Sequence, residues 1–193
     1  RHTADLAKKY NKPIIITEGG SGYLSGNADT TTFAADRIRE AYTSLNMVYP
    51  QVKAIIHFDR SGSGYDYSLQ NNATVQAAYN SALKSNPTLM SSPSQTVTQS
   101  FKPLSQVTGA NGVVTLRAYC DVIGQTVTVT YSVDGKWVGT QKTVPYNCQL
   151  DTSTLTAGNH TLKVVCNAPN GYSQTLNYQL TKAANGSVSF KQA

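Results

Sequence analysis

The chain has 193 residues, enough for one large domain or two small ones, and 39% of them are hydrophobic, so packed cores rather than wholesale disorder are expected. Lys and Arg number 16 against 10 Asp and Glu, a formal net charge of +6. The basic residues are scattered, which argues against nucleic-acid binding, and no apolar run is long enough to span a bilayer. The sequence opens inside a helical pattern without a preceding methionine or signal peptide, so we expect a fragment or a processed product.

The first part of the chain alternates between helical and strand patterns. In chain order, the predicted elements are a helix ending near Tyr10, a strand at 13–18, a helix from about 29 to 49, a strand at 52–58 and a helix at 72–83. The long helix has one apolar face, on which Ile38, Tyr42 and Leu45 recur at spacings of three or four residues. Helices that alternate with strands predict α/β winding around parallel strands.

The first of these strands ends on a carboxylate. Residues 14–17 are all β-branched and lead to Glu18 and the pair Gly19–Gly20, which predicts a short strand buried on both faces. If side chains alternate strictly, Glu18 points to the same side as Ile14 and Ile16. A carboxylate at the carboxyl end of a parallel strand is where α/β folds build active sites. The alternative is an acidic residue that caps the next turn or pairs with a lysine.

Strand patterns dominate the second part of the chain. The composition changes near residue 86, and residues 91–97 form a predicted linker between an α/β part at 1–90 and a β-sandwich at 98–182. Apolar and polar residues then alternate in segments about 8 to 12 residues apart, as in antiparallel sandwiches. Asp134–Gly135 between two such segments predicts a hairpin. Residues 183–193 are mostly polar and are expected to form a tail.

All three cysteines fall in the predicted sandwich. Cys120, Cys148 and Cys166 would each face inward, and a bridge between two of them would suit an exported protein. We favour Cys120 with Cys166, while Cys120 with Cys148 stays open. Three cysteines and one nearby histidine do not have the spacing of a zinc site, so we expect no metal and no cofactor.

Three segments of the first part carry a resemblance to a known family. Residues 12–20 (KPIIITEGG), the helix that ends at residues 49–50 and residues 52–59 (VKAIIHFD) resemble the last two strand–helix units of (β/α)8-barrel retaining glycoside hydrolases. The pattern is similar to that of the family 26-like β-mannanase group and related bacterial polysaccharide hydrolases. The resemblance covers about residues 1–86 and implies that Glu18 is the catalytic nucleophile. It also implies that aromatic residues on the following loops line sugar subsites, here Tyr23, Phe58, Tyr65 and Tyr67.

The resemblance also implies that the active site is incomplete. In this family the acid/base is a glutamate on strand four, which this chain lacks, and two of eight barrel units cannot close a barrel of about 250 residues. We therefore expect the missing barrel segments to lie upstream or on another chain and to cover the sheet. Asp59 is a possible second carboxylate, although it can equally tune the pKa of Glu18 or anchor a loop.

The second part resembles a bacterial immunoglobulin-like module over about residues 98–182. The matching phrases are residues 131–139 (YSVDGKWVG), 150–155 (LDTSTL) and 158–165 (GNHTLKVV). Such modules often follow the catalytic domain of secreted hydrolases, which implies a secreted or cell-surface protein. Trp137 either stacks on a sugar ring or packs in the sandwich, and His57 either assists sugar binding or is a structural residue satisfied by hydrogen bonds.

Two functions follow from these patterns. The first is the C-terminal part of a secreted retaining hydrolase that acts on a β-linked polysaccharide, mannan-like or glucan-like, with the acid/base missing from this chain. The second is a non-catalytic carbohydrate-binding or cell-surface module carried by the immunoglobulin-like part. A spacer without a ligand is a third reading.

Overall fold

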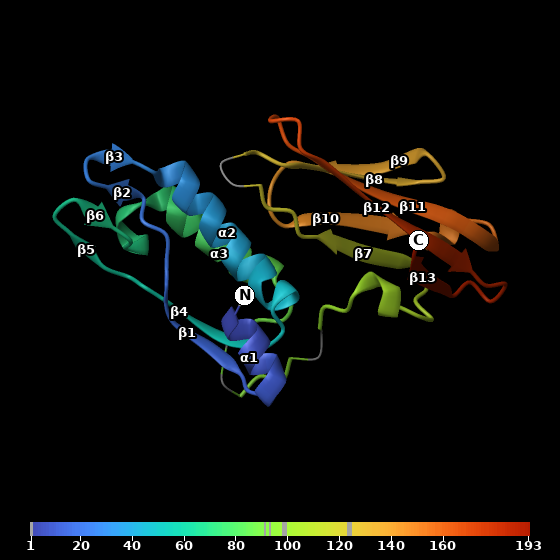
Figure 1. Cartoon of the computed structure of the whole chain (residues 1–193), viewed down its shortest axis with the longest axis horizontal. Helices are drawn as coiled ribbons and strands as arrows, with labels where there is room; N and C mark the ends of the chain where they lie inside the picture. Colours follow the sequence, from blue (N-terminus) through green and yellow to red (C-terminus); the bar gives the residue numbers. More distant parts are fainter. Residues whose placement is uncertain (1, 91, 93, 98–99, 123–124) are drawn as a thin grey trace. The chain divides into compact units, whose positions relative to one another are not determined.

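The computed structural model describes all residues except 1, 91, 93, 98–99 and 123–124. The chain forms two compact units, Arg1–Ser100 and Phe101–Ala193 (Figure 1). Residues 91 and 93 of the expected linker lie outside the described residues, and its other residues form neither helix nor strand.

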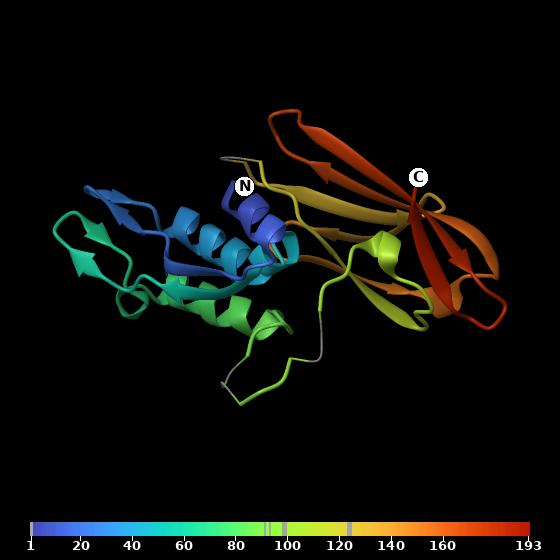
Figure 2. The same ribbon diagram turned by 60° about the horizontal axis from the view of Figure 1, so that its bottom comes forward.

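The first unit has the predicted order of helices and strands. Its main elements are α1 (His2–Tyr10), β1 (Ile14–Gly19), α2 (Thr31–Val48), β4 (Val52–His57) and α3 (Ala73–Ser85). β1 and β4 pair in parallel, as the sequence predicts. The helices α2 and α3 run side by side in both views of the ribbon (Figures 1 and 2).

The helices of this unit pack through small and aromatic side chains. Ala34, Ile38 and Tyr42 recur every four residues along α2 and are buried, and they meet Val75 and Ala82 of α3 in one apolar cluster. α3 begins where the Asn72 side chain accepts hydrogen bonds from the backbone N–H groups of Thr74 and Val75, at 3.1 and 3.2 Å. The helical layer is therefore well specified by local sequence.

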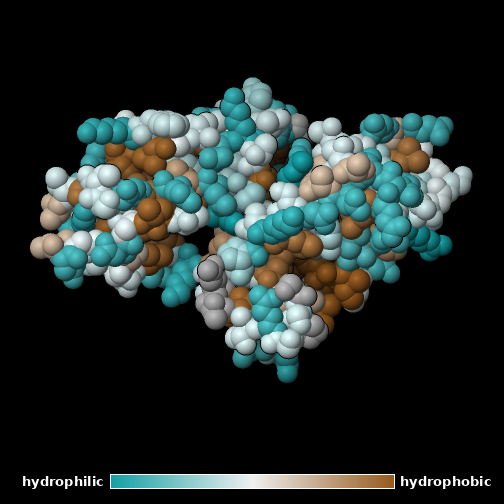
Figure 3. Space-filling view, turned by 180° about the vertical axis from the view of Figure 1, so that it is seen from behind, coloured by the Kyte–Doolittle hydropathy of each residue, from teal (hydrophilic) through white to brown (hydrophobic). Residues whose placement is uncertain are grey.

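The sheet of this unit is covered on one face only, so the expectation of a strand buried on both faces is corrected. Ile55 of β4 packs against the helical cluster, whereas Ile15 and Ile56 are 59% and 55% exposed. Among the described residues no third strand pairs with β1 or β4. In the rear view of Figure 3, hydrophobic side chains reach the surface in the part of the molecule where these strands lie. The described part of the chain therefore leaves some of the apolar side chains of the sheet, such as Ile15, largely uncovered.

The second unit is a β-sandwich of two antiparallel sheets. The small sheet pairs β7 (Val113–Ala118) with β10 (Tyr146–Asp151). The larger sheet has the order β13-β12-β11-β8-β9. Its strands are β8 (Thr128–Val133), β9 (Lys136–Gln141), β11 (Gly158–Asn167), β12 (Ser173–Lys182) and β13 (Val188–Gln192). The inward residues of both sheets form one core, with Val129, Leu162 and Leu180 fully buried.

The turn and the cysteines of the sandwich follow the predictions. Asp134 and Gly135 join β8 to β9 and both have positive φ, 50° and 76°, as a tight hairpin of this type requires. A disulfide joins Cys120 to Cys166, the pairing that we favoured, and Cys148 is a buried free thiol.

The expected tail at 183–193 is wrong. β13 pairs antiparallel with β12, and Val188 and Phe190 are only 1% and 3% exposed. The two apolar side chains alternate with Ser189 and Lys191, so the strand presents one apolar face to the core although its composition is mostly polar.

Candidate functional site

A β-bulge positions Glu18 at the carboxyl end of β1. Ile16 pairs with Ile55, and Gly19 pairs with His57, so three steps along β1 match two along β4. A Cβ on Gly19 would lie 2.9 Å from the Ile55 side chain and 3.3 Å from the Ile16 side chain, which places Gly19 on their face of the strand. Strict alternation would place it on the opposite face. The extra residue of the bulge therefore lies between them, at Thr17 and Glu18.

The bulge turns Glu18 away from the helices. Thr17 and Glu18 are both exposed, while Ile16 is half-buried on the helical side. Glu18 thus shares the open face of the sheet with Ile15, and the expectation that it points with Ile14 and Ile16 is corrected. A bulge is a known means of re-aiming one side chain of a strand, often beside an active site.

The Glu18 carboxylate makes no hydrogen bond or ion pair within the described part of the chain. The alternative of a turn cap or a lysine pair therefore has no counterpart in this structure. The other glutamate of the chain, Glu40, lies in α2 and pairs with Arg37 at 2.7 Å. Of the two glutamates, Glu18 is the one without such a partner among the described residues.

The two loops that follow β1 and β4 are joined in a small antiparallel sheet. Its strands, in the order β3-β2-β6-β5, have two residues each: β2 (Leu24–Ser25), β3 (Ala28–Asp29), β5 (Ser61–Gly62) and β6 (Tyr65–Asp66). Both ribbon views show the two hairpins projecting together beyond the same end of β1 and β4 (Figures 1 and 2). Strands of two residues show no period in the sequence, so the sequence predicts only loops here.

The small sheet brings three of the four expected substrate-binding aromatic residues together. The ring centroids of Phe58 and Tyr67 are 5.3 Å apart in an edge-to-face arrangement, and those of Tyr65 and Tyr67 are 6.1 Å apart. All three side chains are half-buried. A Cβ on Gly22 would lie 3.2 Å from the Tyr67 ring, so the absence of a side chain there lets the loop after Glu18 lie against the aromatic row.

Tyr23 is placed differently from the other three. Its side chain is 8% exposed and belongs to the helical core, so the ring is not presented to a substrate. Burial and the nearby Asp66 carboxylate raise its pKa to about 12. Its hydroxyl has no hydrogen-bond partner among the described residues.

The carboxylates after β4 hold the loop in place. Asp59 Oδ1 accepts a hydrogen bond from the Leu69 N–H at 3.0 Å, which is the loop-anchoring role considered above. Asp66, which the sequence analysis did not single out, accepts from the Ser68 N–H at 2.8 Å and from Asn71 Nδ2 at 3.0 Å. Its position two residues before a serine, typical of a local turn, is a signal that could have found it.

His57 lies on the helical side of the sheet. Its ring centroid is 5.4 Å from that of Tyr79 and 6.4 Å from that of Tyr42, and Nε2 is 3.2 Å from the Tyr67 carbonyl oxygen. This arrangement favours the structural reading of His57, because Glu18 occupies the opposite face. Burial, and to a smaller degree Tyr79, raises the pKa of Tyr42.

Comparison with known proteins assigns the second unit. Residues 93–164 match the bacterial Ig domain family. With the sandwich described above, the match confirms an Ig-like domain in this chain, and the structure extends the sheet beyond the matched residues by β12 and β13. No curated protein matches the chain. Among the described helices, none is long and apolar enough to cross a membrane.

Solved structures resemble the chain only distantly. Fibronectin(III)-like modules of CbhA from Clostridium thermocellum match at 18% identity and a TM-score of 0.34, over 40% of this chain and 87% of that chain. The endo-β-1,4-mannanase from Thermotoga petrophila matches at 14% identity and a TM-score of 0.32, over 92% of this chain. This chain spans 40% of the mannanase chain. Scores this low assign neither fold nor function to the first unit.

Proposed function

We propose that this chain is the C-terminal part of a secreted retaining glycoside hydrolase that acts on a β-linked polysaccharide, mannan-like or glucan-like. The observation that carries the proposal is the β-bulge, which points the free Glu18 carboxylate to the open face of the sheet. We choose this class of enzyme because residues 12–20 and 52–59 resemble the last two barrel units of such enzymes.

In this proposal Glu18 is the nucleophile. A Glu18 oxygen bonds to the anomeric carbon while the glycosidic C–O bond breaks and the leaving oxygen takes a proton from the acid. Water, deprotonated by the same group, then attacks the anomeric carbon and releases Glu18. The two carboxyl groups of a retaining enzyme lie about 5 to 5.5 Å apart. Phe58, Tyr65 and Tyr67 would line a sugar subsite beside them.

The acid/base comes from elsewhere in this proposal. Asp59 is bonded to the Leu69 N–H, and Glu40 is paired with Arg37, so neither is suited to protonate a leaving group. We assign that role to the barrel segments that the resemblance requires. The same segments would cover Ile15 and Ile56, which are each more than half exposed. The 193-residue chain by itself is then expected to be inactive.

A matched pair of variants in the longer protein tests the proposal. Glu18→Gln removes the nucleophile and keeps the shape of the side chain, so kcat on mannan or glucan should fall by about 10⁴-fold or more, comparable to loss of a covalent nucleophile elsewhere. Glu40→Gln makes the same chemical change on α2 and should leave kcat within about twofold, because Glu40 is paired with Arg37 and takes no part in the proposed reaction. Equal activity of both variants would rule out Glu18.

A further inference from the structure

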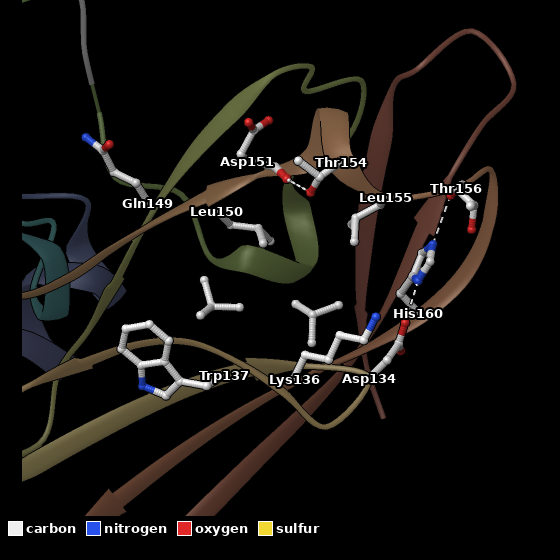
Figure 4. A pocket seen from close by; sticks show the side chains of 12 residues that line it. Asp134, Lys136, Trp137, Gln149, Leu150, Asp151, Thr154, Leu155, Thr156 and His160 are labelled. Carbon is white, nitrogen blue, oxygen red and sulfur yellow. Dashed lines mark hydrogen bonds and ion pairs between the residues drawn. The ribbon is translucent and has the colours of Figure 1, made fainter.

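A hollow of about 470 Å³ lies at one edge of the Ig-like sandwich. It is bounded by the β8–β9 hairpin on one side and by β10 and the turn after it on the other (Figure 4). Val133, Val138, Leu150 and Leu155 supply apolar lining, and charged or polar side chains complete it. This volume lies within the range of small-molecule sites.

Trp137 is the aromatic wall of the hollow. It is the only tryptophan of the chain and is 71% exposed, the most exposed large hydrophobic side chain among the described residues. Its Nε1–H donates to Thr140 Oγ1 at 3.0 Å, which fixes the orientation of the indole. The structure therefore decides against the packing alternative for Trp137. A flat apolar face that is held in place and open to solvent is ready to contact a ligand.

Polar groups at the other end are held in place without a ligand. His160 Nδ1 lies 2.6 Å from Asp134 Oδ2, and Asp134 Oδ1 accepts from the Thr161 N–H at 2.7 Å. His160 Nε2 lies 2.9 Å from the Thr156 carbonyl oxygen. Figure 4 places Trp137 and Gln149 at one end of the hollow and Asp134, Thr156 and His160 at the other.

Two residues that line the hollow have side-chain donors without a partner in the described part of the chain. They are Lys136 and Gln149, and neither side chain makes a hydrogen bond or an ion pair there. Asp134 and Asp151 add negative charge on the same rim, where Asp151 Oδ1 accepts from the Ser153 N–H at 2.9 Å. Both signs of charge are present, so the rim suits a neutral ligand with many hydroxyl groups better than an anion or a cation.

We propose that the Ig-like domain binds a neutral oligosaccharide in this hollow, with Trp137 stacking on one sugar ring. A sugar ring has an apolar C–H face for the indole and hydroxyl groups for polar side chains of the lining such as Lys136. This binding does not require the hydrolase activity, because the hollow is built wholly from the second unit.

The test uses the 193-residue chain with mannohexaose and cellohexaose as probes. The emission of the single tryptophan should shift on titration with at least one of them. Binding measured by calorimetry should weaken about tenfold or more in Trp137→Ala, the change expected for loss of one aromatic contact of about 1.4 kcal/mol. Tyr172→Ala, which removes another exposed aromatic residue of the same domain, should bind as the unaltered chain does.

Two results would overturn the proposal. One is that neither hexaose binds the unaltered chain at millimolar concentration. The other is that Trp137→Ala binds as tightly as Tyr172→Ala while its circular dichroism spectrum is native. Glu18→Gln should bind both hexaoses unchanged, so failure of this proposal and failure of the hydrolase proposal give different results.

Discussion

The two units of the chain bury their apolar residues to very different extents. In the Ig-like unit, inward side chains from both sheets meet, and Val129, Leu162 and Leu180 are fully buried. In the first unit, the helices cover one face of a two-stranded sheet and leave Ile15 and Ile56 more than half exposed on the other. Parallel strands normally lie under cover on both faces. The comparison teaches that the Ig-like unit completes its own core, while the first unit leaves one face of its sheet uncovered within the described part of the chain.

The largest effect on stability is expected in the core of the Ig-like unit. Leu162→Ala leaves a cavity where a fully buried side chain packed, so the free energy of unfolding of that unit should fall by about 2–5 kcal/mol. Urea denaturation followed by Trp137 fluorescence reports this unit, because it holds the single tryptophan.

Truncation of an apolar side chain in the first unit is expected to have a much smaller effect than Leu162→Ala. Ile15→Ala in the 193-residue chain should change the free energy of unfolding by less than about 0.5 kcal/mol, because the side chain is 59% exposed. In the longer protein, where we expect this face to be covered, the cost should rise toward the value for a buried isoleucine, about 2 kcal/mol or more. An equally small cost in both settings would contradict the idea that this face receives further structure.

The Asp134–His160 pair at the hairpin of the Ig-like unit is expected to make a smaller, pH-dependent contribution to stability. The hydrogen bonds that His160 donates to the Asp134 carboxylate and to the Thr156 carbonyl raise the pKa of His160 above 6.5. The stabilisation is therefore fully present below pH 6.5 and is lost as the pH rises through the higher pKa of the folded state. The hydrogen bonds from His160 and Thr161 lower the pKa of Asp134 below 3.8, so its contribution to stability is lost as the pH falls below 3.8 through the folded pKa.

The variant His160→Gln separates this pair from other titrating groups. Its stability should no longer decline between about pH 6.5 and the higher folded pKa, whereas the stability of the unaltered chain should. The difference should be small, since Asp134 is 46% exposed and water weakens such pairs. A decline that persists in His160→Gln would show that another group causes it.

Local signals predicted the parts of the fold that depend on nearby residues. The Asp134–Gly135 hairpin and the order of helices and strands in the first unit followed from turn chemistry and periodicity. β13 was missed because only Val188 and Phe190 mark its inner face. The small sheet after β1 and β4 was missed because each of its strands is two residues long.

The orientation of Glu18 is the instructive case. The sequence placed a carboxylate at the end of a strand, but strict alternation put it on the wrong face. The bulge that re-aims it depends on how β1 pairs with β4, more than thirty residues later, and on Gly19 fitting against Ile16 and Ile55. Pairing of this kind is a property of the folded sheet, so no local pattern in residues 12–20 could have shown it.

The most direct measurement is to trap the proposed covalent intermediate on the longer protein. A 2-fluoro sugar with an activated leaving group, in mannose and glucose forms, slows release of the sugar and leaves the enzyme ester in place. Peptide mass spectrometry should then find one fluoro-sugar on the peptide that contains Glu18, and no label in Glu18→Gln. A label on a carboxylate in another peptide, or hydrolysis that proceeds normally in Glu18→Gln, would contradict the account.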